Sequence, residues 1–302
     1  MPSLKVVRKR IVSVKSTQKI TRAMKMVAGA KLNRAQQRIV AMRPYAVKTA
    51  EILESVAGSM TSSASDSDAP SDGLHALLAR RPEKKTLIVV LSGDRGLCGG
   101  FNTNISKATE REWRAKTNDG IAVEFLTLGK KGREYLARRG GKIAHDFPRV
   151  YDGLDLAKAR LIAQWLVTRF EKGEYDAIYL AYNEFKSAIT QKVVLEPLLP
   201  LREPEKGAGG GDGATPTEFL YEPNQRAILE QLMPMYVEIS IYRALLESQA
   251  SFFGAQMTAM DAATRNAKDM IGRLTLVYNR ARQAAITKEL MEIIGGAEAL
   301  KE

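Results

Sequence analysis

The sequence predicts an α/β protein with a long helix at each end and a central α/β domain between them. The two long helices are expected to pair as an antiparallel coiled coil. A heptad pattern of apolar residues runs through 4–56, and a second runs through 228–284. Between them, apolar runs of strand type alternate with stretches of helical spacing. We therefore expect four segments: an N-terminal coiled-coil helix (1–57), a flexible linker (58–85), the α/β domain (86–222) and a C-terminal coiled-coil helix (223–302).

The N-terminal helix is predicted by a seam of positions that alternate by three and four residues. Twelve of its sixteen positions are apolar, which matches the 3.5-residue period of a left-handed coiled coil. Pro44 is expected to kink or interrupt this helix, since proline lacks an amide donor and clashes with the preceding turn. The seam positions are Leu4, Val7, Ile11, Val14, Gln18, Thr21, Lys25, Ala28, Leu32, Ala35, Ile39, Met42, Ala46, Thr49, Leu53 and Val56.

The C-terminal helix is predicted by the same pattern, with fifteen of seventeen seam positions apolar and no proline after Pro234. These positions are Ile228, Leu232, Met235, Ile239, Tyr242, Leu246, Gln249, Phe253, Gln256, Met260, Ala263, Ala267, Met270, Leu274, Val277, Ala281 and Ala284. A lone helix would leave such a stripe exposed to water, so the two helices are expected to cover each other. An antiparallel pair is the simplest arrangement.

The central domain is predicted by apolar strand-like runs at 86–92, 122–128 and 177–183. Helical spacing follows at 102–116 and at 156–170. Because strands alternate with helices, we expect a mostly parallel sheet with helices on its faces.

Composition excludes several kinds of site. The net charge is +12, which predicts an anionic partner: nucleic acid, phospholipid or an acidic protein surface. With one cysteine, Cys98, and two histidines, His75 and His145, we expect no internal disulfide and no zinc site. No apolar run is long enough to span a membrane. The Ser/Asp-rich tract 60–73 and the glycine tract 207–214, the latter interpreted as a hairpin tip, are expected to be flexible and without function.

A glycine-rich turn, "VVLSGDRGLCGGFN" (89–102), follows the first strand and invites comparison with phosphate-binding loops. Counting from Gly93, a P-loop would need glycine where Cys98 stands and lysine where Gly99 stands. The dinucleotide fingerprint fails as well. We therefore expect a tight turn in which glycines permit positive φ and close backbone approach. A nucleophilic role for Cys98 is not favoured, since no basic partner is identifiable.

The sequence otherwise lacks paired carboxylates, Ser-His-Asp spacing and metal-ligand clusters. Glu289 and Glu292 lie three residues apart on one helix face, which indicates a solvated or partner-facing pair rather than acid–base chemistry. The sequence predicts no catalytic residue, no metal ligand and no cofactor.

The strongest charge feature is the N-terminal helix, where residues 1–50 contain thirteen lysines and arginines and no acidic residue precedes Glu51. Three interpretations compete: a nucleic-acid-binding helix, a cleaved presequence, and a helix facing acidic protein surfaces. The first aromatic residue is Tyr45, so little is available to stack on bases. The heptad seam runs through the whole stretch, which argues against a presequence. The residues alone leave nucleic acid and protein open as partners.

Five stretches of the sequence resemble the gamma subunit of F-type ATP synthases. They span both ends and the middle of the chain in the order of that family. One departure is "SGDRG", where the family usually has "SSDRG" or "TSDRG". The stretches are "RKRIVSVKSTQKITRAMKMVAGAKLNRAQ" (8–36), "LSGDRGLCGGFNTNI" (91–105), "YNEFKSAITQ" (182–191), "MTAMDAATRNA" (257–267) and "YNRARQAAITKELMEIIGGAEAL" (278–300).

The resemblance implies an antiparallel coiled-coil shaft and a central Rossmann-like domain that binds no nucleotide. It implies a non-catalytic rotor, one copy per complex, that carries torque from the membrane ring of c subunits to the ring of alpha and beta subunits, with epsilon as a further partner. Nucleic acid is then not a partner. It also implies a peripheral, indirect membrane association on the cytoplasmic face of a bacterial inner membrane. The chain begins at the motif-bearing helix, so we expect no transit peptide, and a single cysteine does not fit the thiol-regulated chloroplast type.

The resemblance further assigns residues to subunit interfaces. Met24 and Arg95 match positions that face an acidic lever segment of the beta subunits, and Lys25 lies beside Met24. Four polar residues match positions that engage the alpha/beta ring: Arg282, Gln283, Thr287 and Glu289.

Within residues 18–31 the seam is irregular. Its polar seam positions are Gln18, Thr21 and Lys25, and a second apolar stripe displaced around the helix consists of Ile20, Met24 and Val27. We expect the helix to loosen its grip on its partner here and to turn the second stripe toward the surrounding ring.

Overall fold

The computed structural model describes residues 3–64, 76–78, 81–201 and 225–299. The chain divides into two compact units, the first made of Met1–Ala30 with Gln256–Glu302 and the second of Lys31–Ala255. Helices α1 (Leu4–Ala64) and α5 (Gln225–Ala299) each contribute to both units.

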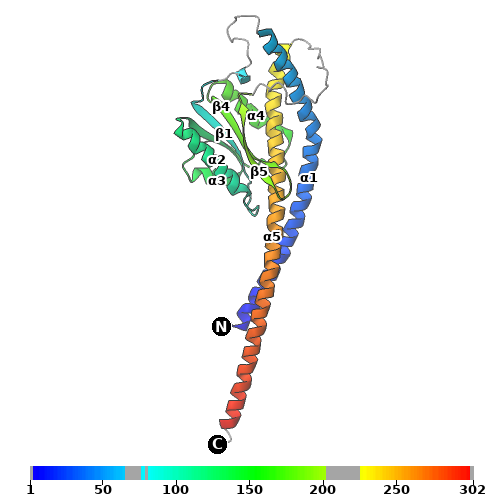
Figure 1. The fold of residues 1–302 in the computed structure, drawn as a ribbon, viewed down its shortest axis with the longest axis vertical. Helices are drawn as coiled ribbons and strands as arrows, with labels where there is room; N and C mark the ends of the chain where they lie inside the picture. The colour runs from blue at the N-terminus through cyan, green and yellow to red at the C-terminus, as the bar shows by residue number, and fades with distance from the viewer. Residues whose placement is uncertain (1–2, 65–75, 79–80, 202–224, 300–302) are drawn as a thin grey trace. The chain divides into compact units, whose positions relative to one another are not determined.

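In the first unit, α1 and α5 lie side by side and run in opposite directions (Figure 1). The hydroxyl of Thr21 lies 2.8 Å from that of Thr264, and Lys25 pairs with Asp261 at 2.5 Å. Figure 1 also shows that α5 continues past the start of α1. The predicted antiparallel coiled coil is confirmed.

The burial of α1 follows the predicted seam. Val7, Thr21 and Ala28 are buried, whereas the residues that flank each of them along the sequence are for the most part exposed. Pro44 does not interrupt the helix, because α1 continues to Ala64. The tract 60–73 is helical as far as residue 64, and its remainder lies outside the described residues, as does the tract 207–214.

The second unit contains a five-stranded sheet in the order β3-β2-β1-β4-β5. The first four of these strands pair in parallel, and β5 pairs with β4 in the antiparallel sense. The predicted mostly parallel sheet is confirmed. The strands are β1 (Lys85–Leu91), β2 (Ala122–Leu128), β3 (Ile143–Phe147), β4 (Ala177–Phe185) and β5 (Gln191–Leu199).

Helices cover both faces of this sheet (Figure 1). Helices α2 (Phe101–Asn118) and α3 (Lys130–Ala137) pack on one face around Ile88 and Val90 of β1. Helix α4 (Leu156–Glu171) and part of α5 pack on the other face, in a larger apolar core that also includes the 3-10 turn η1 (Ala76–Leu78).

Besides the short turn η1, one helix and two strands were not predicted. Helix α3 spans only eight residues, and β3 contains His145 and Asp146, so neither has a strong apolar pattern. Strand β5 carries Pro197, which pairs with Tyr179. Proline is tolerated there because β5 is an edge strand and needs amide donors on one side only.

Candidate partner-contact surfaces

The carboxyl end of β1, where open α/β sheets bind their ligands, is filled by the chain itself. A Cβ added to Gly93 would lie 2.9 Å from the ring of Phe252 on α5. That ring stands edge-on to Phe101 at 5.5 Å between centroids, and Cys98 and Ala255 complete the cluster. The expected close backbone approach therefore occurs at Gly93, against the ring of Phe252 on α5, and positive φ occurs at Gly99.

The thiol of Cys98 is buried in this cluster. Burial raises the pKa of the thiol, although a hydrogen bond from Asn102 opposes the shift. Since the thiolate is the nucleophilic form, this environment is that of an inert structural cysteine. Among the described residues, no group of three His, Cys, Asp or Glu side chains is placed to hold a metal ion.

The turn after β1 presents two exposed side chains, Arg95 and Leu97. Its shape is held by Asn102, whose side-chain oxygen accepts from the Gly93 amide at 2.8 Å and whose amide group donates to the Arg95 carbonyl at 3.1 Å. Leu97 has a φ of 62°, a strained value for a residue with a Cβ. The turn is thus a fixed projection from the second unit.

In the first unit, the irregular stretch of α1 does not loosen. Thr21 is only 9% exposed and meets Thr264, while Lys25 meets Asp261, whose other oxygen pairs with Arg265. The expectation of a weakened grip is wrong, because polar residues on α5 match the polar seam positions of α1.

The predicted seam of α5 is correct only in part. Ala267, Leu274 and Ala281 are buried or half-buried as expected, but Met270 and Val277 are about half exposed. The alternate positions are taken by the residues one place further along, namely Ile271, Tyr278 and Ala285. Upstream, in the second unit, α5 is buried on more than one side, since Met233, Val237, Ile241 and Leu245 belong to the large core.

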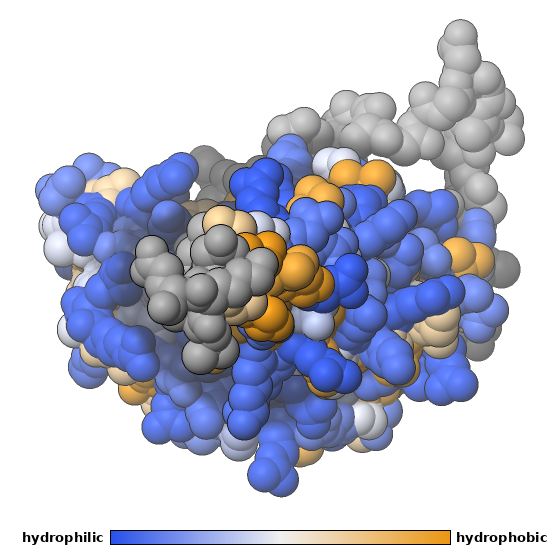
Figure 2. All heavy atoms as spheres, turned by 90° about the horizontal axis from the view of Figure 1, so that it is seen from below, coloured by the Kyte–Doolittle hydropathy of each residue, from blue (hydrophilic) through white to orange (hydrophobic). Residues whose placement is uncertain are grey.

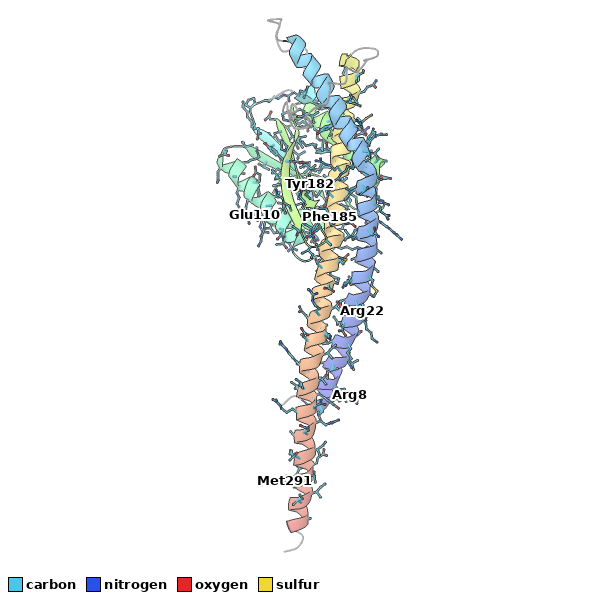
Figure 3. The ribbon with its side chains drawn as sticks, turned by 45° about the vertical axis from the view of Figure 1, so that its right-hand side comes forward. Arg8, Arg22, Glu110, Tyr182, Phe185 and Met291 are labelled. Atoms are coloured by element: carbon cyan, nitrogen blue, oxygen red, sulfur yellow. The ribbon has the colours of Figure 1, made fainter. Side chains whose placement is uncertain are left out.

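The second apolar stripe of α1 faces outward. Ile20 is 57% and Val27 56% exposed, and Met24 between them is half-buried. Basic residues surround the stripe: Lys19 and Arg22 are exposed, and Arg22 projects away from the helix pair in Figure 3. The stripe and its basic border form a surface that α5 does not cover.

The end of α5 is exposed. Arg282, Gln283 and Glu289 lie there, and Thr287 donates a hydrogen bond to the Gln283 carbonyl at 3.0 Å. Figure 3 marks Met291 on this end, and Figure 2, which views the molecule from below, shows apolar side chains gathered near the centre of that view. The exposed apolar residues of this stretch are Ile286, Leu290, Met291, Ile293 and Ile294.

The predicted interface residues therefore fall into separate groups. Met24 and Lys25 lie near Asp261 in the first unit. Arg282 follows Asp261 by 21 residues on the same helix, which is roughly 30 Å at 1.5 Å per residue. Arg95 belongs to the second unit. Within the first unit, Met24 and Lys25 on α1 therefore lie apart from the group on α5 that begins at Arg282.

Comparison with known proteins identifies the family. Residues 3–300 match the family of sequences described as ATP synthase. The ATP synthase gamma chain of Sorangium cellulosum (strain So ce56) is 58% identical over an alignment of 323 residues that covers 100% of both chains. The chain belongs to the ATP synthase gamma chain family. The gamma chain of Geobacter sp. (strain M21) is 47% identical over 301 residues, again with 100% of both chains covered.

Solved structures agree with this assignment. The central stalk and c-ring structure of the Tetrahymena thermophila mitochondrial ATP synthase contains a chain that is 26% identical, with a TM-score of 0.61. The match covers 81% of this chain and 99% of that one. A chain of the Euglena gracilis mitochondrial ATP synthase is 18% identical with a TM-score of 0.65, covering 98% and 94% respectively, and shows the shared fold.

Several residues that hold the helix pair and the turn after β1 in place were not predicted from the sequence. Asp261 and Thr264 were not singled out, because they meet their partners on α1 only once the helices pair. Asn102 was missed although its place after a glycine-rich turn was a usable signal. None of the helices in the described ranges is long and apolar enough to cross a membrane.

Proposed function

We propose that this chain is the central-stalk rotor of a proton-translocating F-type ATP synthase. It carries torque between a membrane ring of c subunits and a ring of alpha and beta subunits, in which the nucleotides are bound. Membership of the gamma chain family supports this role, as does the likeness to a chain in a central stalk and c-ring structure. The chain itself carries no catalytic site and acts within the complex, peripheral to the cytoplasmic face of a bacterial inner membrane, with epsilon as a further partner.

The observation that carries the proposal is the surface of the first unit. A helix pair with a narrow seam leaves Ile20 and Val27 exposed beside basic residues, and the end of α5 exposes Ile293 and Ile294. Exposed apolar residues in such a row mark a surface that a partner covers. Basic side chains that stay hydrated make contacts that are individually weak, so a rotor can exchange them from one subunit to the next.

We assign the interface residues by surface. Met24, with the exposed Lys19 and Arg22 beside it, faces acidic segments of the beta subunits, together with Arg95 on the turn after β1. Arg282, Gln283, Thr287 and Glu289 engage the alpha/beta ring at the end of α5. The exposure of Arg95, Arg282, Gln283 and Glu289 supports this assignment.

The test is alanine substitution in the reconstituted complex. Arg282→Ala and Gln283→Ala should each lower rotation-coupled ATP turnover by about two- to tenfold, since each removes a polar contact of about 0.5–1.5 kcal/mol. Arg111→Ala, at an exposed arginine on α2, is the control and should leave turnover unchanged. All three chains should fold normally, as judged by circular dichroism. Unchanged turnover in both α5 variants would contradict the assignment.

A further inference from the structure

The seam of the first unit contains a polar layer made by two pairs of residues. The hydroxyls of Thr21 and Thr264 lie 2.8 Å apart, so one of them donates to the other. The hydroxyl that accepts can donate its own proton to a carbonyl of its own helix, that of Gln18 at 3.1 Å or that of Met260 at 2.7 Å. One turn further along α1, the Lys25 ammonium contacts one oxygen of Asp261. Arg265, on α5, contacts the other oxygen.

The ion pair differs from an ordinary surface pair. Asp261 is held from both helices at once, and its side chain is 29% exposed while that of Lys25 is 44% exposed. The hydrogen bond from Lys25 is the largest influence and lowers the pKa of Asp261; burial opposes it, and the charges of Arg265 and Lys25 lower the pKa further. The carboxylate therefore stays ionised, and keeps its two partners, over the physiological pH range.

Several other seam positions give weak information about register. Ala28, Ala263, Ala267 and Ala281 occupy seam positions near the layer or along α5, and small side chains pack almost equally well after one helix slides past the other. A polar pair does not tolerate such a slide. If α1 slipped by one heptad toward the C-terminus of α5, Lys25 would lie opposite Lys268, a like charge.

We propose that the Thr21–Thr264 and Lys25–Asp261 pairs set the axial register of α1 against α5, and thereby fix where the outward stripe of α1 is presented. Lys25 is then a positioning residue inside the rotor rather than a contact to a partner subunit. The stripe lies on the same turns of α1: Met24 adjoins Lys25 in the sequence, and Ile20 adjoins Thr21. The register is a property of the isolated chain, whereas its effect on coupling rests on the proposed function.

The register is measured by disulfide formation. A Cβ added to Gly29 would lie 3.4 Å from the sulfur of Met257, which shows that these two positions face each other across the helix pair. The rate at which cysteines placed there cross-link therefore depends on the register of the helices. The full-length chain carries Gly29→Cys and Met257→Cys in a Cys98→Ser background and is oxidised under mild conditions. Lys25→Glu or Asp261→Lys alone should slow cross-linking by about tenfold, because each places like charges across the seam. The double reversal should restore it to within about twofold.

A second pair of variants separates register from stability. Thr21→Val with Thr264→Val removes both hydroxyls while keeping the side-chain shape. Helix content and thermal stability should be kept or raised, yet the cross-linked fraction should fall by about half, since buried polar residues specify register at a cost in stability. A merely structural role for the layer would instead lower stability and leave the cross-link intact. Undiminished cross-linking in the charge-reversal and valine variants, or no recovery in the double reversal, would overturn the proposal.

The functional arm uses the reconstituted complex. Lys25→Glu should lower coupled ATP turnover by about fivefold, and the addition of Asp261→Lys should recover at least about half of the loss. If the cross-linking results are as expected while turnover is unaffected, the register assignment stands. The proposed contact of the outward stripe of α1 (Ile20, Met24 and Val27) with partner subunits then fails. If cross-linking is unaffected while turnover falls, Lys25 contacts a partner and the register assignment fails.

Discussion

Helix α5 takes part in both compact units, and its side chains are covered in different ways in the two. In the second unit, residues such as Val237, Ile241 and Leu245 are fully buried in an apolar core shared with the sheet and α4. In the first unit the same helix buries one narrow stripe, and Leu276 is 71% exposed.

The difference shows that a continuous helix can serve two purposes without a change of secondary structure. The buried stretch fixes α5 to a domain, and its stability comes from apolar area removed from water. The exposed stretch buries only one of its sides within the chain. Its remaining apolar residues stay exposed, as on surfaces that partners cover. Three predictions, from the largest expected effect to the smallest, test either this contrast or the stability of the second unit alone.

Removing apolar volume should separate the two stretches most strongly. Leu245→Ala should lower the free energy of unfolding by about 2–5 kcal/mol, because it leaves a cavity in a closed core. Leu276→Ala, the matched control on the same helix, should change it by less than about 0.5 kcal/mol. Urea unfolding followed by the fluorescence of Trp113 and Trp165, both in the second unit, and by circular dichroism measures the effect. Equal losses in the two variants would remove the contrast.

Acid should weaken the second unit through one carboxylate. Burial alone would raise the pKa of Glu124, but hydrogen bonds from Lys142, Tyr175 and Lys85 outweigh it and lower the pKa to about 2. Because the pKa of Glu124 in the folded chain lies below the ordinary glutamate value of 4.5, the network adds stability above that pH, and this stability is lost as the pH falls toward about 2. The loss should be about 3 kcal/mol.

Glu124→Gln should remove this pH dependence, as followed by tryptophan fluorescence in urea between pH 2 and about 6, a range set by the two pKa values. Glu171→Gln, at an exposed residue of α4, is the control and should retain it. A variant at Glu124 that still loses stability with the same midpoint would show that other carboxylates carry the effect.

Two glycines of α5 should respond with opposite signs. In the described part of the chain nothing lies within 4 Å of a Cβ built at Gly272, so Gly272→Ala should stabilise the helix by about 0.5–1 kcal/mol. At Gly254 the added Cβ would lie 3.3 Å from the backbone of Ala188, so Gly254→Ala should destabilise by up to about 1 kcal/mol. Amide hydrogen exchange of α5 peptides reads each site locally. A gain at both would mean that the hairpin at Ala188 yields freely.

Much of the fold could be predicted from the sequence, and the elements that were not predicted have physical reasons. The strands at β1, β2 and β4 have continuous apolar runs and were predicted, whereas β5 lies at an edge and mixes charges with Pro197. On α5, both Met270 and Ile271 are apolar, so the pattern alone does not say which one enters the seam.

For the candidate surfaces, too, one part could be predicted from the sequence and another could not. The polar seam positions of α1 were visible, but their partners were not, since Asp261 meets Lys25 across 236 residues. Local spacing carries no information about a pairing at that distance. The interface roles of Arg95 and Arg282 remain predictions, supported by exposure alone.

The pairing of Thr21 with Thr264 also constrains how the protein is made. These residues are 243 positions apart, so α1 leaves the ribosome long before the helix that covers its seam. At synthesis rates of about 5–20 residues per second, the interval is roughly 10–50 s. During that time Val7, Ile11 and Ala28 have no partner on α5, while the sheet between them has time to fold. The coiled coil therefore closes last, and until then the newly made helix α1 needs protection from aggregation.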